Sequence, residues 1–180
     1  MKRGFAVVSK YATAGLNLPQ RATKMAAGYD FEVAEDFTLP SIWKLPFIKI
    51  LASLYMKRQL TDHDYEEATA TLKPLLVPTG IKAYMGENEY LIIANRSSNP
   101  LKRGMILPNG VGIIDADYVD NDKNEGEIFI QMVNWGIQDM HLKKGERIGQ
   151  GIFMPFLVTD DDATQEKNDR TGGFGSSGVH

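Results

Sequence analysis

One stretch near the middle of the sequence, NRSSNPLKRG at 95–104, carries side chains suited to an anionic substrate. The guanidinium of Arg96 can form two parallel hydrogen bonds with phosphate oxygens, and Ser97 and Ser98 add hydroxyl groups. Ser98 is also placed to cap a short helix, whose N-terminal N–H groups would attract an anion. The alternative interpretation is a capped turn with a solvent-exposed arginine, which is a common arrangement.

A second stretch, NGVGIIDADY at 109–118, follows a turn signal and ends an apolar run in carboxylates. An aspartate that emerges from such a strand, here Asp115, can serve as a general base if it reaches a water molecule. The alternative is a residue that only forms a turn, which is the more frequent role of a lone aspartate. The aspartates from Asp115 to Asp122 lack the glycine and glutamate spacing of a calcium loop, which excludes that site.

Two further segments contain polar residues in unexpected places. In GERIGQGIFMP at 145–155, Arg147 and Gln150 interrupt an apolar strand and therefore need partners from the protein or from a ligand. The end of the chain, RTGGFGSSG at 170–178, has the composition of a flexible coil. It lacks the lysine and the strand-to-helix context of a phosphate-binding loop, so that motif is excluded.

Short apolar runs between turn signals make up most of the chain, as is typical of an all-β barrel or sandwich. The tetrapeptide GENE at 86–89 is interpreted as a hairpin turn between two of them. The expected strands are 5–10, 27–39, 76–85, 89–94, 111–119, 127–135 and 147–158.

The segment 41–75 departs from this pattern, because its apolar residues recur at spacings of three and four. Thr61 is the expected N-cap of a second helix that Pro74 ends. We therefore expect a helical hairpin inserted into the β scaffold. Its amphipathic run around Trp43 and Tyr55 suits either packing at the rim of an oligomer or a surface that binds a partner protein.

Composition narrows the class of protein. The 180 residues suffice for one substantial domain, and the net charge of −3 argues against a nucleic-acid-binding domain. The chain has no cysteine, which excludes disulfides, cysteine zinc sites and a cysteine nucleophile and fits a cytoplasmic protein. Neither a signal peptide nor a membrane-spanning segment is expected.

Taken in order, five segments closely resemble the five motifs of the trimeric dUTPase family, which includes phage and prophage members. The resemblance implies an all-β, dUTPase-like β-clip or jelly-roll barrel with a helical-hairpin insertion and a mobile glycine-rich C-terminal tail. It further implies one domain at 1–158, an acidic linker at 159–169 and a lid at 170–180. The motif segments are AAGYDFEVA (26–34), NRSSNPLKRG (95–104), NGVGIIDADY (109–118), GERIGQGIFMP (145–155) and RTGGFGSSG (170–178).

The activity implied by this resemblance is hydrolysis of dUTP to dUMP and pyrophosphate with Mg²⁺, which lowers dUTP and supplies dUMP for thymidylate synthesis. Asp115 would activate the attacking water, and Asp30 would contact magnesium through a coordinated water. The sites would be shared between the subunits of a homotrimer. The substrate contacts implied are Arg96, Ser97, Ser98, Asn109, Gly112, Tyr118, Gln150, Arg170, Phe174, Ser176 and Ser177.

The family roles divide these contacts by the part of the nucleotide. Asn109 and the backbone near Gly112 would read the uracil edges, while Tyr118 would exclude a ribose 2′-hydroxyl. Phe174 would stack over the uracil. Arg170 would hold the γ-phosphate, although it stands four residues before Phe174 where the family commonly has five.

Two other functions fit the same chain. One is a nucleotide-responsive regulatory protein that binds dUTP and, through 41–75, a regulatory protein partner, as inserted segments of phage dUTPases can. The other is a relative of dCTP deaminase, which shares the fold. The full set of catalytic-type residues and the glycine-rich fifth motif favour dUTP hydrolysis.

Overall fold

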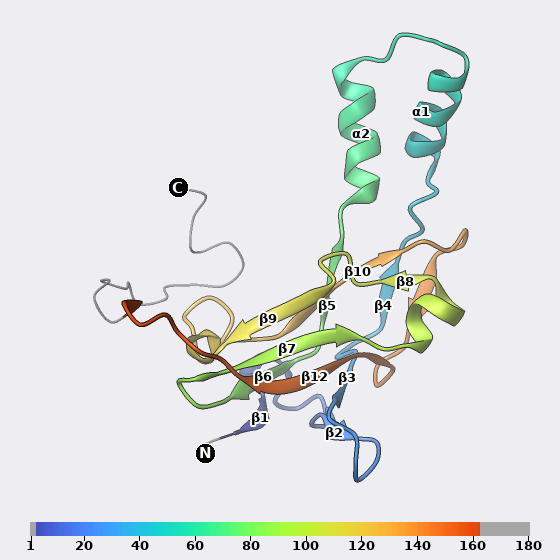
Figure 1. Ribbon diagram of the computed structural model, residues 1–180. Helices are drawn as coiled ribbons and strands as arrows, with labels where there is room; N and C mark the ends of the chain where they lie inside the picture. The colour runs from blue at the N-terminus through green and yellow to red at the C-terminus, as the bar shows by residue number, and fades with distance from the viewer. Residues whose placement is uncertain (1–2, 163–180) are drawn as a thin grey trace.

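The structure is a computed structural model that describes residues 3–162, so the predicted lid and most of the predicted linker lie outside the described residues. The chain forms twelve short strands in this range, with two helices α1 (Leu45–Tyr55) and α2 (Asp62–Leu72) and three helical turns (Figure 1). The turns are η1 (Ser9–Tyr11), η2 (Asn99–Arg103) and η3 (Ala116–Tyr118). The strands are β1 (Gly4–Val7), β2 (Gln20–Arg21), β3 (Tyr29–Glu32), β4 (Phe37–Leu39), β5 (Leu75–Pro78), β6 (Ile81–Tyr84), β7 (Glu89–Asn95), β8 (Met105–Ile106), β9 (Val111–Asp115), β10 (Phe129–Asn134), β11 (Met140–Leu142) and β12 (Arg147–Pro155).

The largest sheet has five antiparallel strands in the order β2-β3-β12-β7-β9. Gln150 of β12 lies opposite Asp30 on one side and Ala94 on the other. Ala94 in turn lies opposite Val111 of β9. The next pair, Gly149 and Asn95, belongs to the same ladder, so residues of the first four motif segments lie next to one another on a single sheet.

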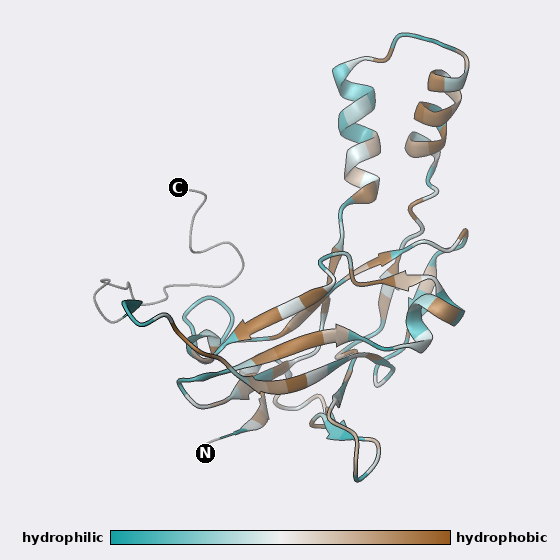
Figure 2. Ribbon diagram, in the orientation of Figure 1, coloured by the Kyte–Doolittle hydropathy of each residue, from teal (hydrophilic) through white to brown (hydrophobic). Residues whose placement is uncertain are grey.

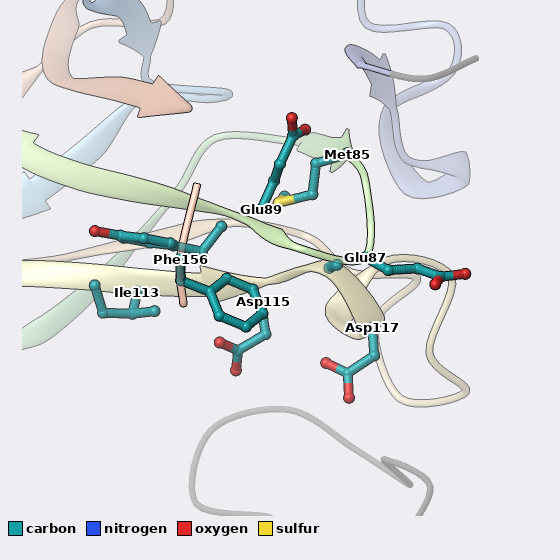
Figure 3. A pocket seen from close by; sticks show the side chains of 9 residues that line it. Met85, Glu87, Glu89, Ile113, Asp115, Asp117 and Phe156 are labelled. Carbon is teal, nitrogen blue, oxygen red and sulfur yellow. The ribbon is translucent and has the colours of Figure 1, made fainter. Parts of the chain in front are cut away.

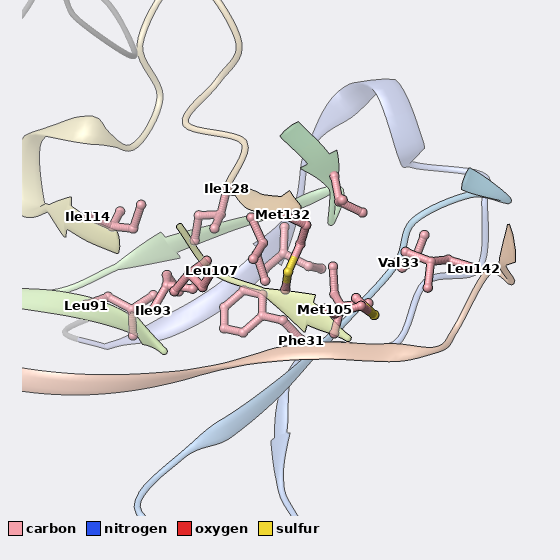
Figure 4. Packing of buried hydrophobic residues seen from close by; sticks show 14 of the residues in the cluster. Phe31, Val33, Leu91, Ile93, Met105, Leu107, Ile114, Ile128, Met132 and Leu142 are labelled. Atoms are coloured by element: carbon pink, nitrogen blue, oxygen red, sulfur yellow. The ribbon is translucent and has the colours of Figure 1, made fainter. Parts of the chain in front are cut away.

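Smaller sheets complete the β body, and their inward faces close one main core. The pairs are β1-β6 and β11-β4, and a three-stranded sheet has the order β5-β10-β8. Successive side chains of β7 point to opposite faces of the sheet, so Leu91 and Ile93 are buried on the same face and belong to one core cluster with Phe31 and Ile130. Figure 4 shows Phe31, Leu91 and Ile93 in this cluster.

Two glycines of β12 allow this core to close around the central strand. A Cβ at Gly149 would stand 2.6 Å from Cδ1 of Ile130, and one at Gly151 would stand 2.7 Å from Cε2 of Phe31. Because real Cβ atoms do not approach other carbons so closely, the glycines of this segment serve packing rather than chain flexibility.

The helical hairpin forms where the sequence predicts it, and it stands off the β body (Figure 1). Thr61 caps α2 in a capping box: its hydroxyl accepts a hydrogen bond from the Asp64 amide, and the Asp64 carboxylate accepts one from the Thr61 amide at 2.8 Å. Helix α1 is mainly hydrophobic and α2 mainly hydrophilic (Figure 2). The hairpin therefore has one apolar member and one polar member.

A group of hydrogen bonds anchors the first arm of the hairpin to the loop after β10. Asp139 accepts from the Ser41 amide at 2.9 Å and from Nζ of Lys44 at 2.8 Å. The indole Nε1 of Trp43 donates to the carbonyl of Trp135 at 3.1 Å. These contacts fix the direction in which α1 leaves the body.

Several strand predictions are wrong in detail. The expected strand 27–39 is split into β3 and β4, and the expected strand 76–85 is split at Gly80, whose φ of +66° suits glycine. GENE does form a turn, but the strands it joins lie in different sheets: β6 pairs with β1, whereas β7 pairs with β12 and β9. The predicted hairpin is therefore wrong, because each strand finds its partner far away in the sequence.

Within residues 3–162 no helix combines the length and the apolar character that crossing a membrane would require.

Two neighbouring glutamates on the loop before β10 have opposite electrostatic environments. Glu127 is 4% exposed and accepts a hydrogen bond from the Gly80 amide at 3.2 Å, and its burial raises the pKa of its carboxyl group. Glu125 accepts from the amide and hydroxyl of Ser9, and these bonds lower its pKa.

The replacement Glu127→Gln should raise the melting temperature at pH 7.5 and have less effect at pH 4. A raised pKa in the folded state means that the folded protein binds the proton of Glu127 more tightly than the unfolded protein does. The stability that the protonated carboxyl contributes is therefore lost as the pH rises from the pKa of the unfolded state through that of the folded state. The side-chain amide of the glutamine keeps an oxygen that can accept from the Gly80 amide, and it carries no charge. The control Glu125→Gln should act in the opposite direction, because the charged form of that group is the stabilised one. Melting curves at the two pH values measure both, and equal shifts for the two variants would contradict the assignment.

Candidate active site

The first candidate group is a carboxylate held between two arginines. Asp30 on β3 is only partly exposed; Nε of Arg96 lies 3.1 Å from its Oδ1, and Nη1 of Arg147 lies 3.0 Å from its Oδ2. Arg96 follows the last residue of β7 and Arg147 begins β12, so the three charges come from three strands of one sheet. We call Asp30, Arg96, Arg147 and Gln150 the Asp30 cluster.

Gln150 completes this cluster from the centre of β12. Its Nε2 donates to the carbonyl of Asn95 at 3.2 Å, which ties the side chain to the residue before Arg96. A Cβ at Gly28 would stand 2.6 Å from Oε1 of Gln150, so a larger residue at this position would displace the Gln150 amide. The polar residues that the sequence predicts on β12 therefore find partners inside the sheet.

The loop between β7 and η2 presents the predicted hydroxyl groups. Ser97 is exposed and Ser98 is half-buried. The expectation that Ser98 caps the following helix is wrong, since its side chain makes no cap hydrogen bond and its backbone is already helical, with φ −73° and ψ −22°. An N-cap residue needs an extended backbone for its hydroxyl to reach the first amides.

The second candidate group surrounds Asp115 at the far end of β9. Asp115 is exposed and borders an open pocket of about 650 Å³, which we call the Asp115 pocket (Figure 3). The carboxylates of Asp115 and Asp117 project to the same side of it (Figure 3). Its lining residues are Met85, Glu87, Glu89, Tyr90, Ile113, Asp115, Ala116, Asp117 and Phe156.

The residues predicted to recognise the base and sugar are spread along this β9 segment. Asn109 is exposed in the turn before β9, where Gly110 has a φ of +71°, and Gly112 lies within the strand. Tyr118 is buried, and its hydroxyl donates to the carbonyl of Glu127 at 2.9 Å. The structure thus holds Tyr118 rigidly, while its contact with a sugar stays a prediction.

The two groups lie at opposite ends of the β7–β9 pair. Ala94, next to the Asp30 cluster, faces Val111, whereas Asp115 faces Tyr90. Four residues of strand separate these positions, which is roughly 13 Å along the sheet. One chain therefore does not bring the Asp115 carboxylate into contact with the arginines of the Asp30 cluster.

The described residues contain no group of three or more histidine and acidic side chains that could hold a metal ion by themselves. Both oxygens of Asp30 accept from arginines, which does not suit direct ligation. Mg²⁺ usually keeps several waters and binds through substrate phosphates with few protein ligands. The donor set would therefore suit a magnesium ion that is carried by a polyphosphate, and Asp30 would act on such an ion only indirectly, as a hydrogen-bond acceptor.

Sequence reasoning did not assign three residues of this region. Arg147 pairs with Asp30, and Asn95 and Asn99 form hydrogen bonds behind the Arg96 loop. The signal for Arg147 was its charge on an otherwise apolar strand. The predicted contacts Arg170, Phe174, Ser176 and Ser177 lie outside the described residues.

Comparison with known proteins covers nearly the whole chain. The dUTPase family model matches residues 63–178. A deoxyuridine 5′-triphosphate nucleotidohydrolase of Lactococcus lactis subsp. lactis (strain IL1403) is 46% identical over 177 residues, which are 98% of each chain. A match of that length includes the hairpin segment, so the insertion is not peculiar to this chain.

Solved structures confirm the predicted fold class. The crystal structure of dUTPase from Streptococcus mutans matches with a TM-score of 0.67 and 40% identity, over 87% of this chain and 98% of that one. The dUTPase from phage phi11 of S. aureus matches with a TM-score of 0.60 over 89% and 94% of the two chains. At 16% identity the phage enzyme supports the fold alone.

Proposed function

Because the chain belongs to the dUTPase family, we propose that it hydrolyses dUTP to dUMP and pyrophosphate, with Asp115 as the general base. The proposal depends above all on one observation: Asp115 stands at an open pocket in a chain that matches a deoxyuridine 5′-triphosphate nucleotidohydrolase over 98% of both lengths. The cysteine-free sequence supports a cytoplasmic location.

The proposed mechanism uses Asp115 to take a proton from a water molecule that attacks the α-phosphorus in line with the departing pyrophosphate. A positioned carboxylate of this kind contributes about 10²–10⁴-fold. Arg96, Ser97, Ser98 and Gln150 would donate hydrogen bonds to the phosphate oxygens, and the guanidinium of Arg96 would compensate part of their charge. A bound magnesium ion would supply further neutralisation of the triphosphate.

Asn109 and Gly112 would meet the uracil, and the buried Tyr118 would leave no room for a ribose 2′-hydroxyl. A pocket with paired polar groups rejects the wrong base strongly, because that base would leave buried groups without partners. Selection of uracil over cytosine is the property that would distinguish a dUTP-hydrolysing enzyme from a dCTP deaminase.

We further propose a homotrimer in which the Asp115 pocket of one chain meets the Asp30 cluster of a neighbour. The separation of the two groups along β9 supports this arrangement, and so does the apolar surface beside Asp115. Ile113 is 52% exposed and Phe156 is 40% exposed, both line the Asp115 pocket, and exposed apolar surface of this kind is typical of an interface.

The replacement Asp115→Asn should lower kcat for dUTP by about 10²–10⁴-fold, because it removes the proton acceptor and keeps the side-chain shape. Pyrophosphate release measures turnover, and gel filtration with light scattering checks the assembly. Turnover near that of the wild type would refute the base assignment. Ammonia release from dCTP, with no pyrophosphate from dUTP, would favour the deaminase alternative.

Mixing two inactive variants tests the shared site. Asp115→Asn and Arg96→Ala should each be inactive, yet refolded together at equal amounts they should regain about one quarter of wild-type activity. A site is active when its aspartate comes from an Arg96→Ala chain and its arginine from an Asp115→Asn chain. Random assembly meets each condition with a probability of about one half, so about one quarter of the sites are active. Refolding either variant alone is the control. No recovery from the mixture would contradict a site shared between chains.

A second candidate role, binding of a regulatory protein, concerns the hairpin. Helix α1 exposes Leu51, Leu54 and Tyr55, the last at 90%, on an element that projects from the body (Figure 1). Replacing Leu45–Leu72 with a short glycine–serine linker retains the anchor residues Ser41 and Lys44. This variant should keep its assembly and its dUTP turnover and lose any protein that co-purifies with the full chain. Recovery of the same proteins with both forms would exclude the hairpin as the binding surface.

A further inference from the structure

We propose that Asn99 is a positioning residue, whose buried side chain holds the phosphate-binding loop 96–98 against strand β12. The inference rests on the proposed function of that loop as the polyphosphate contact. Asn99 is 0% exposed and is the first residue of η2, directly after the loop. It would touch no substrate atom and would act through Arg96, Ser97 and Ser98.

The orientation of the Asn99 amide is fixed by its partners. Nδ2 donates to Oδ1 of Asn95 at 2.8 Å and to the carbonyl of Ile148 at 2.7 Å. Asn95 in turn donates from its Nδ2 to the carbonyl of Met105 at 3.1 Å, so its own Oδ1 must face Asn99. Since both partners of Asn99 are acceptors, only the nitrogen can point toward them.

The Ile148 carbonyl is a special position in the sheet. The pairing of β12 with β3 shifts register between Arg147 and Gly149, and neither neighbouring strand pairs with Ile148 there. A bulge of this kind leaves a backbone group without its ladder partner, and the Asn99 amide satisfies it.

The loop is therefore held at two consecutive carbonyls of β12. Nη1 of Arg96 lies 3.3 Å from the carbonyl of Arg147, and Asn99 binds the next one. Separately from its side chain, the backbone N–H of Asn99 donates to the Arg96 carbonyl at 2.9 Å, which closes the turn around the two serines. Gln150, two residues beyond the bulge, bonds to Asn95. These contacts place the serine hydroxyls and the Gln150 amide at a fixed separation, as a polyphosphate contact requires.

Stability alone does not explain an asparagine at this position. Its Oδ1 is buried and finds no hydrogen-bond partner among residues 3–162, and such an acceptor normally costs stability. The side-chain amide of Asn99 thus holds the loop in place although its unpartnered oxygen lowers the stability of the folded protein. This pattern is expected where the position of a loop is needed for binding a ligand.

Asn134 provides a matched control for Asn99. It is also buried, at 1% exposure, and its Nδ2 donates to the carbonyls of Leu39 and Gln138. It lies beside the hairpin anchor rather than beside the loop 96–98. Asn99→Ala and Asn134→Ala therefore each remove a buried side-chain amide, one beside the loop 96–98 and the other beside the hairpin anchor.

The experiment measures binding of inorganic tripolyphosphate by calorimetry and dUTP kinetics with both variants. Asn99→Ala should weaken tripolyphosphate binding and raise KM for dUTP by about tenfold, with a much smaller change in kcat. Asn134→Ala should lower the melting temperature similarly and leave both quantities near the wild type. Equal losses in the two variants would show a merely structural role and overturn the inference.

A second variant keeps the test decisive if Asn99→Ala does not fold. Asn95→Ala alters a half-buried side chain and removes one partner of Asn99, so it should weaken tripolyphosphate binding in the same direction. Unchanged binding in Asn95→Ala would then overturn the inference, as would a wild-type protein that binds no tripolyphosphate. Wild-type protein that binds tripolyphosphate and does not hydrolyse dUTP would refute the proposed function alone.

Discussion

The pairing of β12 between β3 and β7 is the interaction on which the remainder of the structure depends. It closes the core, because the two glycines of this strand let Phe31 and Ile130 pack directly against the backbone. The same pairing sets Asp30, Gln150 and Ala94 in one row. Strand pairing alone thus fixes the relative positions of three segments that are far apart in the sequence, independently of the loops between them.

Charge is balanced in this row within the sheet itself. Asp30 is largely shielded from solvent, and a carboxylate in such a place needs compensating donors. Two arginines from neighbouring strands supply them, and in return the carboxylate orients both guanidinium groups. An anion that approaches from solvent would therefore meet cationic groups already arranged. The cost of ordering those side chains is met when the chain folds rather than when the ligand binds.

The sequence predicted the parts of this structure that depend on local sequence patterns. A short apolar run beside the turn GENE marked β7, and the spacing of apolar residues with the Thr61 cap marked the hairpin. The strands β2, β8 and β11 have only two or three residues, too few for any period to show. The pairing of Asp30 with Arg147 joins residues 117 positions apart, and only the register of β12 reveals it. The role of Asn99 could not be predicted from the sequence, since burial of its side chain depends on tertiary packing.

The hairpin makes its own small interior, with Ile50 and Ala68 buried, and neither residue belongs to the hydrophobic clusters of the β body. Its helices are thus a cassette joined to the scaffold at the Ser41 anchor and at β5. Such a cassette can lengthen, shorten or change its surface while the strands keep their registers. The surface of the hairpin can therefore change through substitutions that the five-stranded sheet, with its close packing at Gly149 and Gly151, would not accept.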